Sequence, residues 1–411
     1  GQANSVTELL GNITLKFKLT PEELKGVNPD TLAVYKEDDK GIVTKLYGTY
    51  DAATSTFMVT TDHLCKFYLL AQASGTVPVQ RLWGSTAYDT ALDIAKDTMN
   101  NLGKTKLDYI VLATGDNWKD SLAGSDLAGT LRTPLLITPT NMNSPHAGKV
   151  LKFIQDNGAP NATVYLLGGE GVLGKDYETW AEKQGFTVKR LWGPDAGATA
   201  IKIAEEIKRL TKVNNVSNET YNEGDIRANH QANNQTYNEV FIVTDSAYAD
   251  ALSVASTAIE RKAPILFVNS QRDNAEVVKA LSSLNLKAIY VIGGEGAVPV
   301  KVYNALAANG GALERIAGEN RYGTNKAVFK KFGGNPTTYS FAYGMNYPDG
   351  LTGSVNTWAQ KGFLFLVPKV LTGEESAFYS TLKAEGLIIY GGSGVIDINT
   401  ESRLAQWIKL K

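Results

Sequence analysis

Three short sequence marks recur in the same order three times along this chain of 411 residues. The first mark is Arg-x-x-Gly, the second is an aromatic residue two positions before an aspartate, and the third is a Gly-Gly-x-Gly turn. The arginines are Arg81, Arg190 and Arg315; the aromatic residues and aspartates are Trp118 with Asp120, Tyr248 with Asp250, and Tyr347 with Asp349; the turns begin at Gly168 and Gly169, Gly293 and Gly294, and Gly391 and Gly392. The copies lie roughly 100–125 residues apart, which is the size of a small domain and longer than a solenoid repeat. The chain is therefore predicted to contain three homologous domains in tandem.

Within each copy, short apolar runs alternate with stretches of helical periodicity. The apolar runs are residues 109–113, 134–137 and 164–167 in the first copy, 240–243, 264–267 and 289–292 in the second, and 340–343, 363–366 and 387–390 in the third. Apolar strands that alternate with helices indicate a parallel sheet covered on both faces. Each copy is predicted to be a small doubly wound, Rossmann-like α/β domain.

Residues 1–73 have a different pattern. Residues 12–19 alternate polar and apolar side chains, and four further strand candidates follow, separated by turn residues. This pattern is typical of antiparallel strands with one buried face, so we expect a small β-sandwich-like module. The predicted domains are residues 1–73, 79–187, 188–312 and 313–411. An Asn-rich insertion at 213–238 is expected to be a surface loop or a disordered segment.

Composition narrows the function classes. The net charge of −1 argues against a nucleic-acid binder, which would present a strongly basic face, and an anionic partner would need a local basic patch. No apolar run reaches the 18 or so residues that a spanning helix needs. The lone Cys65 excludes an intramolecular disulfide and a cysteine-rich zinc site.

The repeated marks carry a resemblance to a known family. The motifs concerned are Arg81-Leu-Trp-Gly84 with Tyr88 and Thr90-Ala91, Arg315-Ile-Ala-Gly318 with Arg321-Tyr322, the loop from Gly115 to Leu122, and the apolar stretches Thr133-Pro-Leu-Leu-Ile137 and Ala263-Pro-Ile-Leu-Phe267. Over residues 79–411 they resemble the cell-wall-binding repeat type 2 family of Gram-positive bacteria. The chain departs from the family pattern at Gly197, which replaces a tyrosine, and at 362–366, where Gly-Phe-Leu-Phe-Leu replaces the usual apolar stretch.

The resemblance implies a fold and a function. It implies Toprim-like α/β domains in a pseudo-threefold arrangement, in a secreted protein of the cell wall or surface layer. It also implies noncovalent anchoring of surface-layer proteins through an anionic, teichoic-acid-like wall polysaccharide. Other surface-layer proteins are a second class of partner, and no cofactor is implied.

A parallel sheet binds ligands at the carboxyl ends of its strands, and the aromatic-x-Asp loop and the glycine turn are both expected there. The turn either holds a phosphate with its N–H groups or lets strand and helix pack closely. Trp118, Tyr248 and Tyr347 either stack on sugars or pack in the core or at an interface. The predicted polymer grooves are lined by the glycine turns, by nearby basic side chains and by two apolar triplets, which are Pro134, Leu135 and Leu136 and Pro264, Ile265 and Leu266. The three aromatic residues are further candidate ligand contacts.

The recurring charged residues also have two interpretations each. Asp120, Asp250 and Asp349 are expected to cap the helix that follows, or else to contact a recurring arginine or a ligand. Arg81, Arg190 and Arg315 are expected to lie at interfaces between copies, with phosphate binding as the alternative.

Enzyme chemistry is not expected. None of His63, His146 and His230 recurs between copies, and none has a partner at metal or triad spacing. The acidic residue Asp116, which a Mg²⁺ site would need with Asp120, corresponds to Ser246 and Met345 in the other copies. Metal-dependent phosphoryl transfer is therefore disfavoured and no metal site is predicted. The remaining alternative is a lattice module that packs in a surface layer and binds no polymer.

Overall fold

The computed structural model of the protein describes residues 13–25, 27, 29, 32–37, 43–46, 48–61, 66–71, 76–213, 237–284, 286–309 and 311–411. His63, Cys65 and residues 214–236 of the Asn-rich insertion, which include His230, lie outside the described residues. Residues 1–81 and 369–411 form one compact unit, and residues 82–368 form a second. None of the described helices is long and apolar enough to cross a membrane.

The first unit contains the predicted antiparallel β module. One sheet has the order β1-β5-β4 and the other β3-β2-β6. Their strands are β1 (Ile13–Lys18), β2 (Leu32–Glu37), β3 (Val43–Leu46), β4 (Gly48–Asp51), β5 (Thr56–Thr61) and β6 (Lys66–Ala71). Val34, Phe57 and Val59 are buried in its small core. The alternating pattern therefore predicted this module correctly.

The same unit also holds an α/β part. It consists of β7 (Val79–Leu82), α11 (Gly373–Tyr379), β18 (Lys383–Ala384), β19 (Gly386–Tyr390), α12 (Ile398–Trp407) and β20 (Lys409–Leu410). Strand β7 lies beside β19, and the N–H of Leu387 donates to the carbonyl oxygen of Pro78 at 2.8 Å.

In the second unit, the first sheet has the order β11-β10-β8-β9 with all strands parallel. Its strands are β8 (Leu107–Thr114), β9 (Leu135–Thr138), β10 (Gly158–Leu167) and β11 (Thr187–Leu191). Helices α1 (Ala87–Asn101), α3 (Pro145–Asn157) and α4 (Lys175–Lys183) share one apolar cluster with the sheet. Helix α2 (Trp118–Thr130) packs on the strands through residues outside that cluster.

The second sheet repeats this order as β13-β12-β14-β15, again parallel. Its strands are β12 (Glu239–Thr244), β13 (Ile265–Val268), β14 (Ala288–Ile292) and β15 (Ala312–Ile316). Its helices are α5 (Ala196–Val213), α6 (Tyr248–Arg261), α7 (Ala275–Ser282) and α8 (Val300–Leu306), followed by a 3₁₀ turn (Ala307–Asn309). The third copy contributes α9 (Arg321–Phe332), β16 (Thr338–Tyr343), α10 (Pro348–Ala359) and β17 (Phe363–Val367) to this unit, with β16 and β17 parallel.

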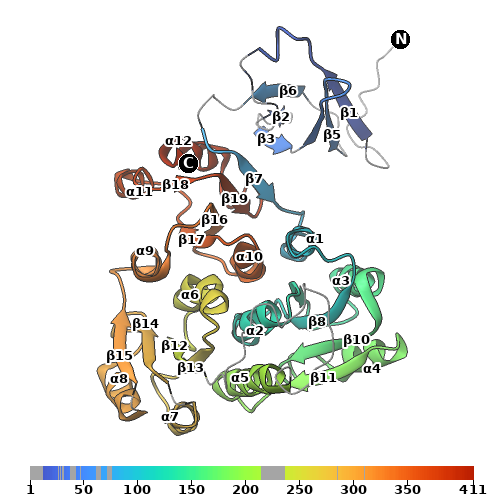
Figure 1. The fold of residues 1–411 in the computed structure, drawn as a ribbon. Helices are drawn as coiled ribbons and strands as arrows, with labels where there is room; N and C mark the ends of the chain where they lie inside the picture. The colour runs from blue at the N-terminus through green and yellow to red at the C-terminus, as the bar shows by residue number, and fades with distance from the viewer. Residues whose placement is uncertain are drawn as a thin grey trace. The chain divides into compact units, whose positions relative to one another are not determined.

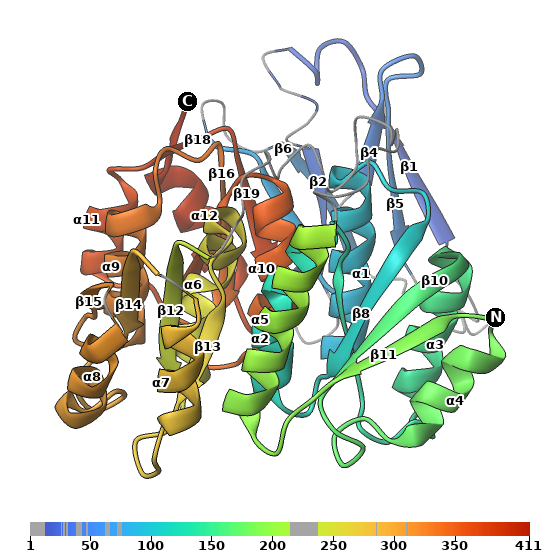
Figure 2. The same cartoon turned by 60° about the horizontal axis from the view of Figure 1, so that its bottom comes forward.

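Three equivalent helices, α2, α6 and α10, pack against one another in the second unit, and Figures 1 and 2 both show them side by side. Nearly every residue in the middle of each helix is buried, as expected for a helix covered on all sides. The first helix of each copy packs on a central helix of another copy: α1 on α10, α5 on α2 and α9 on α6. This cyclic packing is a pseudo-threefold arrangement of parallel α/β domains, as the family resemblance implied.

One feature of the sheets was not expected. The strand that leads into each Arg-x-x-Gly mark pairs with the preceding copy: β11, which carries Arg190, joins β10, and β15, which carries Arg315, joins β14. Strand β7, which carries Arg81, lies beside β19 of the third copy. Each copy in the sequence therefore gives its opening strand to a neighbouring sheet.

Candidate functional site

The recurring arginines contact the recurring glycine turns. Arg190 donates from Nη1 to the carbonyl oxygens of Gly168 at 3.0 Å and Leu173 at 2.8 Å. Arg315 donates to the carbonyl oxygens of Gly293 and Val298, each at 2.8 Å. In both cases the arginine and the turn belong to successive copies.

Arg81 makes the same contact with the third copy. Its Nη1 donates to the carbonyl oxygen of Gly391 at 2.7 Å, and its Nε and Nη2 donate to one carboxylate oxygen of Glu401 at 2.9 and 2.6 Å. Arg81 is 5% exposed and Glu401 is 3% exposed. All three arginines are therefore engaged with protein groups in this structure, and their role in phosphate binding stays a prediction.

The glycine turns need glycine at their first position. Gly168, Gly293 and Gly391 have φ angles of +98°, +110° and +99°, which only glycine adopts readily. A Cβ on Gly168 would lie 2.5 Å from Oδ2 of Asp120, and one on Gly293 would clash with Asp250. The turns therefore allow a close approach of the loop aspartates, which is the packing interpretation of these glycines.

Several N–H groups of the turns are already used. The N–H groups of Val172 and Leu173 donate to Gly169, those of Ala297 and Val298 to Gly294, and those of Val395 and Ile396 to Gly392. These amides do not point to a phosphate, so a phosphate role for Gly169, Gly294 and Gly392 stays a prediction. Trp192, which is 54% exposed, lies beside Gly169.

Asp120, Asp250 and Asp349 lie in the first turns of α2, α6 and α10. The N-caps are Asn117, Ala247 and Tyr347, so the expectation that the aspartates cap these helices was wrong. The three aspartates are instead partly buried. Burial raises the pKa of Asp120, although a hydrogen bond with Thr199 opposes this, and it raises the pKa of Asp250 and of Asp349 to about 6.

The three aromatic residues of the second mark meet at the starts of the central helices. The ring of Tyr248 lies 6.4 Å from that of Trp118 and 5.5 Å from that of Tyr347. The hydroxyl of Tyr347 donates to the carbonyl oxygen of Gly115 at 3.0 Å. Arg321 donates to the Tyr248 hydroxyl at 3.1 Å. The three half-buried rings pack on one another and join the copies, and sugar stacking on them stays a prediction.

The predicted apolar groove residues lie in strands β9 and β13 or just before them. Pro134, Leu135, Leu136, Pro264, Ile265 and Leu266 are all buried. Their side chains fill the domain interior in this structure, and their contact with a ligand stays a prediction. The third copy differs, because Phe363, at the place of Pro134 and Pro264, lines a cavity.

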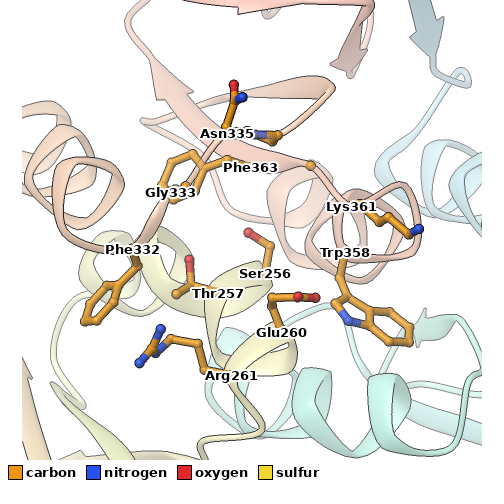
Figure 3. Close-up of a pocket in the computed structure, with 13 residues that line it drawn as sticks. Ser256, Thr257, Glu260, Arg261, Phe332, Gly333, Asn335, Trp358, Lys361 and Phe363 are labelled. Carbon is orange, nitrogen blue, oxygen red and sulfur yellow. The ribbon is translucent and has the colours of Figure 1, made fainter. Parts of the chain in front are cut away.

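This cavity of about 280 Å³ lies between α6, the segment after α9 and the start of β17 (Figure 3). Its lining includes Ser256, Thr257, Glu260, Arg261, Phe332, Asn335, Trp358, Lys361 and Phe363. The hydroxyls of Ser256 and Thr257 point toward the side of the cavity where Asn335, after α9, and Phe363, at the start of β17, lie, and the Glu260 carboxylate points toward Trp358 (Figure 3). Hydroxyl, amide and carboxylate groups beside three aromatic rings and two cations form a lining that suits a sugar or a sugar phosphate. The cavity lies at the amino end of β17, whereas the sequence prediction favoured the carboxyl ends.

A basic residue recurs just before the second strand of every copy. The sequence prediction expected basic side chains near the apolar triplets but did not identify these residues. Arg132, Lys262 and Lys361 have φ angles of 52°, 53° and 55° at the ends of α2, α6 and α10. The same pair of backbone hydrogen bonds closes each end, for example from Lys361 to Trp358 and from Gly362 to Thr357. This is the Schellman motif, in which the left-handed residue is usually glycine. The signal was visible as a basic residue two positions before each apolar stretch.

Arg132 and Lys262 are both partly buried. Nε of Arg132 is buried and has no hydrogen-bond partner among the described residues. Burial lowers the pKa of Lys262. Lys361 is exposed at the rim of the cavity.

Among the described residues, no group of three His, Cys, Asp or Glu side chains could hold a metal ion.

The fold and the recurring contacts define a class of binding proteins built from three α/β repeats. The chain belongs to the family described as Cell wall binding domain 2 (CWB2), whose model matches residues 81–178, 190–303 and 315–401. It is therefore a cell-wall-binding protein of this family, and the family model matches it once for each set of sequence marks.

Comparisons with individual proteins agree with the family. The chain is 24% identical over 288 residues to the N-acetylmuramoyl-L-alanine amidase LytC of Bacillus subtilis (strain 168), covering 70% of this chain and 50% of the amidase. It is 23% identical over 276 residues to the Amidase enhancer of the same organism, covering 67% of this chain and 32% of that protein. The chain thus spans half or less of the curated relatives that it matches.

Two solved structures share the fold. Cwp6 from Clostridium difficile matches 97% of this chain and 66% of its own, with a TM-score of 0.66 and 16% identity. Cwp8 from the same organism matches 97% of this chain and 63% of its own, with a TM-score of 0.67 and 20% identity.

Proposed function

We propose that this chain anchors a surface protein noncovalently to the bacterial cell wall by binding an anionic, teichoic-acid-like polysaccharide. Family membership supports the cell wall as the target. The anionic character of the ligand is inferred from the basic residues that lie at the C-terminal ends of the three central helices.

The observation that carries the proposal is the cation that recurs in a left-handed conformation at the end of α2, α6 and α10. Arg132, Lys262 and Lys361 occupy positions where an L-residue costs roughly 1 kcal/mol relative to glycine. The helix C-terminus offsets part of this conformational cost, because its partial negative charge stabilises a nearby cation by about 0.3–1 kcal/mol. A charge retained at the same unfavourable position in three divergent copies is the pattern expected of a residue that binds a repeating anionic ligand.

The cavity of Figure 3 supplies the neighbouring polar groups in the proposed site. Arg261 is held by Glu239 at 2.6–2.7 Å and lies 4.7 Å above the ring of Phe332. Lys361 has no ion pair among the described residues. In the proposed site it contacts a phosphate or carboxylate of the polymer, while the hydroxyls of Ser256 and Thr257 bind sugar oxygens.

Weak sites on several copies would together give a higher overall affinity for one polymer, because the second contact forms at high effective concentration once the first has formed. No deep pocket is then needed for firm attachment. The amidase and enhancer relatives are longer than this chain, and we propose no enzymatic activity for it.

The test is cosedimentation with Gram-positive cell walls of a Lys262→Gly/Lys361→Gly variant. Glycine removes both charges and suits φ angles above zero, so the variant should fold normally. We expect at least tenfold weaker wall binding. The control is Lys152→Gln/Lys202→Gln, which removes two exposed lysines of α3 and α5 and should bind like the wild type. Equal binding by the two double variants would refute this site.

A further inference from the structure

The first and third copies fill the carboxyl edge of their sheets with a tyrosine that the second copy lacks. Tyr88, the second residue of α1, packs over Gly115, where a Cβ would lie 2.7 Å from its ring. Tyr322, the second residue of α9, packs over Gly344, where a Cβ would lie 2.5 Å from its ring. In both copies the glycine after the first strand is needed because the tyrosine ring occupies the space above it.

The second copy has different residues at both positions of this pair. Its α5 has Gly197 in place of the tyrosine, and Asp245 follows β12 in place of the glycine. A cavity of about 360 Å³ opens there, and both residues line it. Ligand pockets in proteins begin at roughly 300 Å³, so the space left by the missing ring is large enough for one sugar.

The lining of this cavity is rich in hydrogen-bond acceptors that are held in place. The amide of Asn269 donates to both carboxylate oxygens of Asp245, at 3.1 and 2.8 Å. Asn269 is fixed in turn by Asn274, which accepts from its N–H at 2.8 Å and donates to its carbonyl oxygen at 2.9 Å. This network sets the orientation of the Asp245 carboxylate before any ligand arrives, which lowers the ordering cost of binding.

The charge of the lining is negative. Four carboxylates line the cavity, with Asp195 and Asp245 among them, against the single guanidinium of Arg272. Nη1 of Arg272 lies 3.9 Å from Asp195. In the first copy His146 stacks on Tyr88, whereas the equivalent position of the second copy is Glu276, another carboxylate of the lining. A phosphate or uronic acid would be repelled here, and a ligand that donates hydrogen bonds and carries positive charge would be favoured.

We propose that this cavity, here called the Gly197 pocket, binds an amino sugar whose amine is unacetylated and protonated. The ammonium group would donate to the Asp245 carboxylate, and the ring hydroxyls would donate to the other acceptors. The proposal goes beyond anionic-polymer binding and does not depend on it, because it concerns another edge of the repeats and the opposite charge. It gives the second copy a specificity that the first and third copies lack.

The test uses ligand-observed NMR titration of the full chain with D-glucosamine, N-acetyl-D-glucosamine, D-glucose and D-glucuronic acid, at a pH that keeps the amine protonated. We expect saturable glucosamine binding with a Kd on the order of 1 mM. The other three sugars should bind at least tenfold more weakly. Equal binding of glucose or N-acetyl-D-glucosamine would overturn the ammonium selectivity, and so would the absence of saturable binding by any sugar.

The decisive variant is Gly197→Tyr/Asp245→Gly, which restores the pair found in the first and third copies. It should fold and lose glucosamine binding by at least tenfold. Asp245→Asn, which keeps the shape and removes the charge, should weaken glucosamine binding to a similar extent. Unchanged glucosamine binding by either variant would overturn the proposal. The Lys262→Gly/Lys361→Gly variant should still bind glucosamine, so this inference and the proposed function fail separately.

Discussion

Arg81 donates a hydrogen bond of 2.7 Å to the carbonyl oxygen of Gly391, which lies 310 residues further along the chain. The same contact joins Arg190 to Gly168 and Arg315 to Gly293, each across 22 residues. The first arginine therefore binds the last glycine turn, and the third copy is completed by a strand and a side chain from the start of the first.

Replacing Arg81 by methionine should be strongly destabilising. The change removes the hydrogen bonds to Glu401 and leaves a buried carboxylate without its cation, which costs about 3–5 kcal/mol. Arg315→Met is the matched control, because Arg315 binds carbonyl oxygens and has no ion pair in the described part of the chain. Urea unfolding of both variants measures the difference. Equal losses of stability would contradict the importance assigned to the Arg81–Glu401 pair.

Gly168→Ala should destabilise the first glycine turn by about 1–3 kcal/mol. Its φ of +98° is unfavourable for alanine, and the added Cβ would collide with Asp120. Gly171→Ala is the control, since nothing lies within 4 Å of a Cβ at that position. Thermal unfolding of the two variants checks this. Similar melting temperatures would show that the turn relaxes without cost.

The free energy of unfolding should fall as the pH rises from about 4 to about 7. Burial raises the pKa of Asp126 to about 7 and of Asp250 and Asp349 to about 6. In this range the folded chain binds more protons than the unfolded chain, so its stability is greatest at the lower pH and is lost as these groups ionise. The carboxyl of Glu206, whose pKa is lowered to about 2 by Arg209 and Tyr165 despite its partial burial, loses its contribution only at lower pH.

Asp126→Asn should flatten the upper part of this pH dependence. The amide cannot ionise, so the variant should be more stable than the wild type above pH 7, by an amount on the order of 1 kcal/mol or more. Denaturant titrations at several pH values measure it. A wild-type stability that stays constant or increases between pH 5 and 7 would contradict the raised pKa values of these carboxyls.

Wall binding should weaken as salt is added. Charges that pair at an exposed edge are screened over about 8–10 Å at physiological ionic strength, and Lys361 is exposed. Cosedimentation at increasing sodium chloride measures this directly. Binding that is independent of salt would point instead to uncharged wall components.

The recurring sequence marks were sufficient to predict the repeats. The parallel α/β class and the β module could be predicted because local secondary structure is visible in the hydrophobic periodicity of the sequence. The exchange of β7, β11 and β15 between sheets could not be predicted, since strand pairing depends on contacts between copies. The capping role expected for Asp120 was wrong because Asn117 precedes it and takes the N-cap.

The candidate sites were harder to predict for physical reasons. The basic residue at 132, 262 and 361 is visible in an alignment of the copies, but its left-handed backbone appears only with the ends of the helices. The sequence also showed that Gly197 replaces a tyrosine. That this opens a cavity follows only from the packing of Tyr88 over Gly115 in the equivalent place.

The central claim is that the chain binds an anionic polymer of the wall. The most direct measurement is cosedimentation of the pure protein with Gram-positive cell walls before and after hydrofluoric acid, which cleaves phosphodiester-linked polymers and leaves peptidoglycan. We predict that binding is lost with the polymer. Binding that survives the treatment would contradict a phosphodiester-linked polymer and indicate peptidoglycan, and no binding to either wall would favour a lattice module instead.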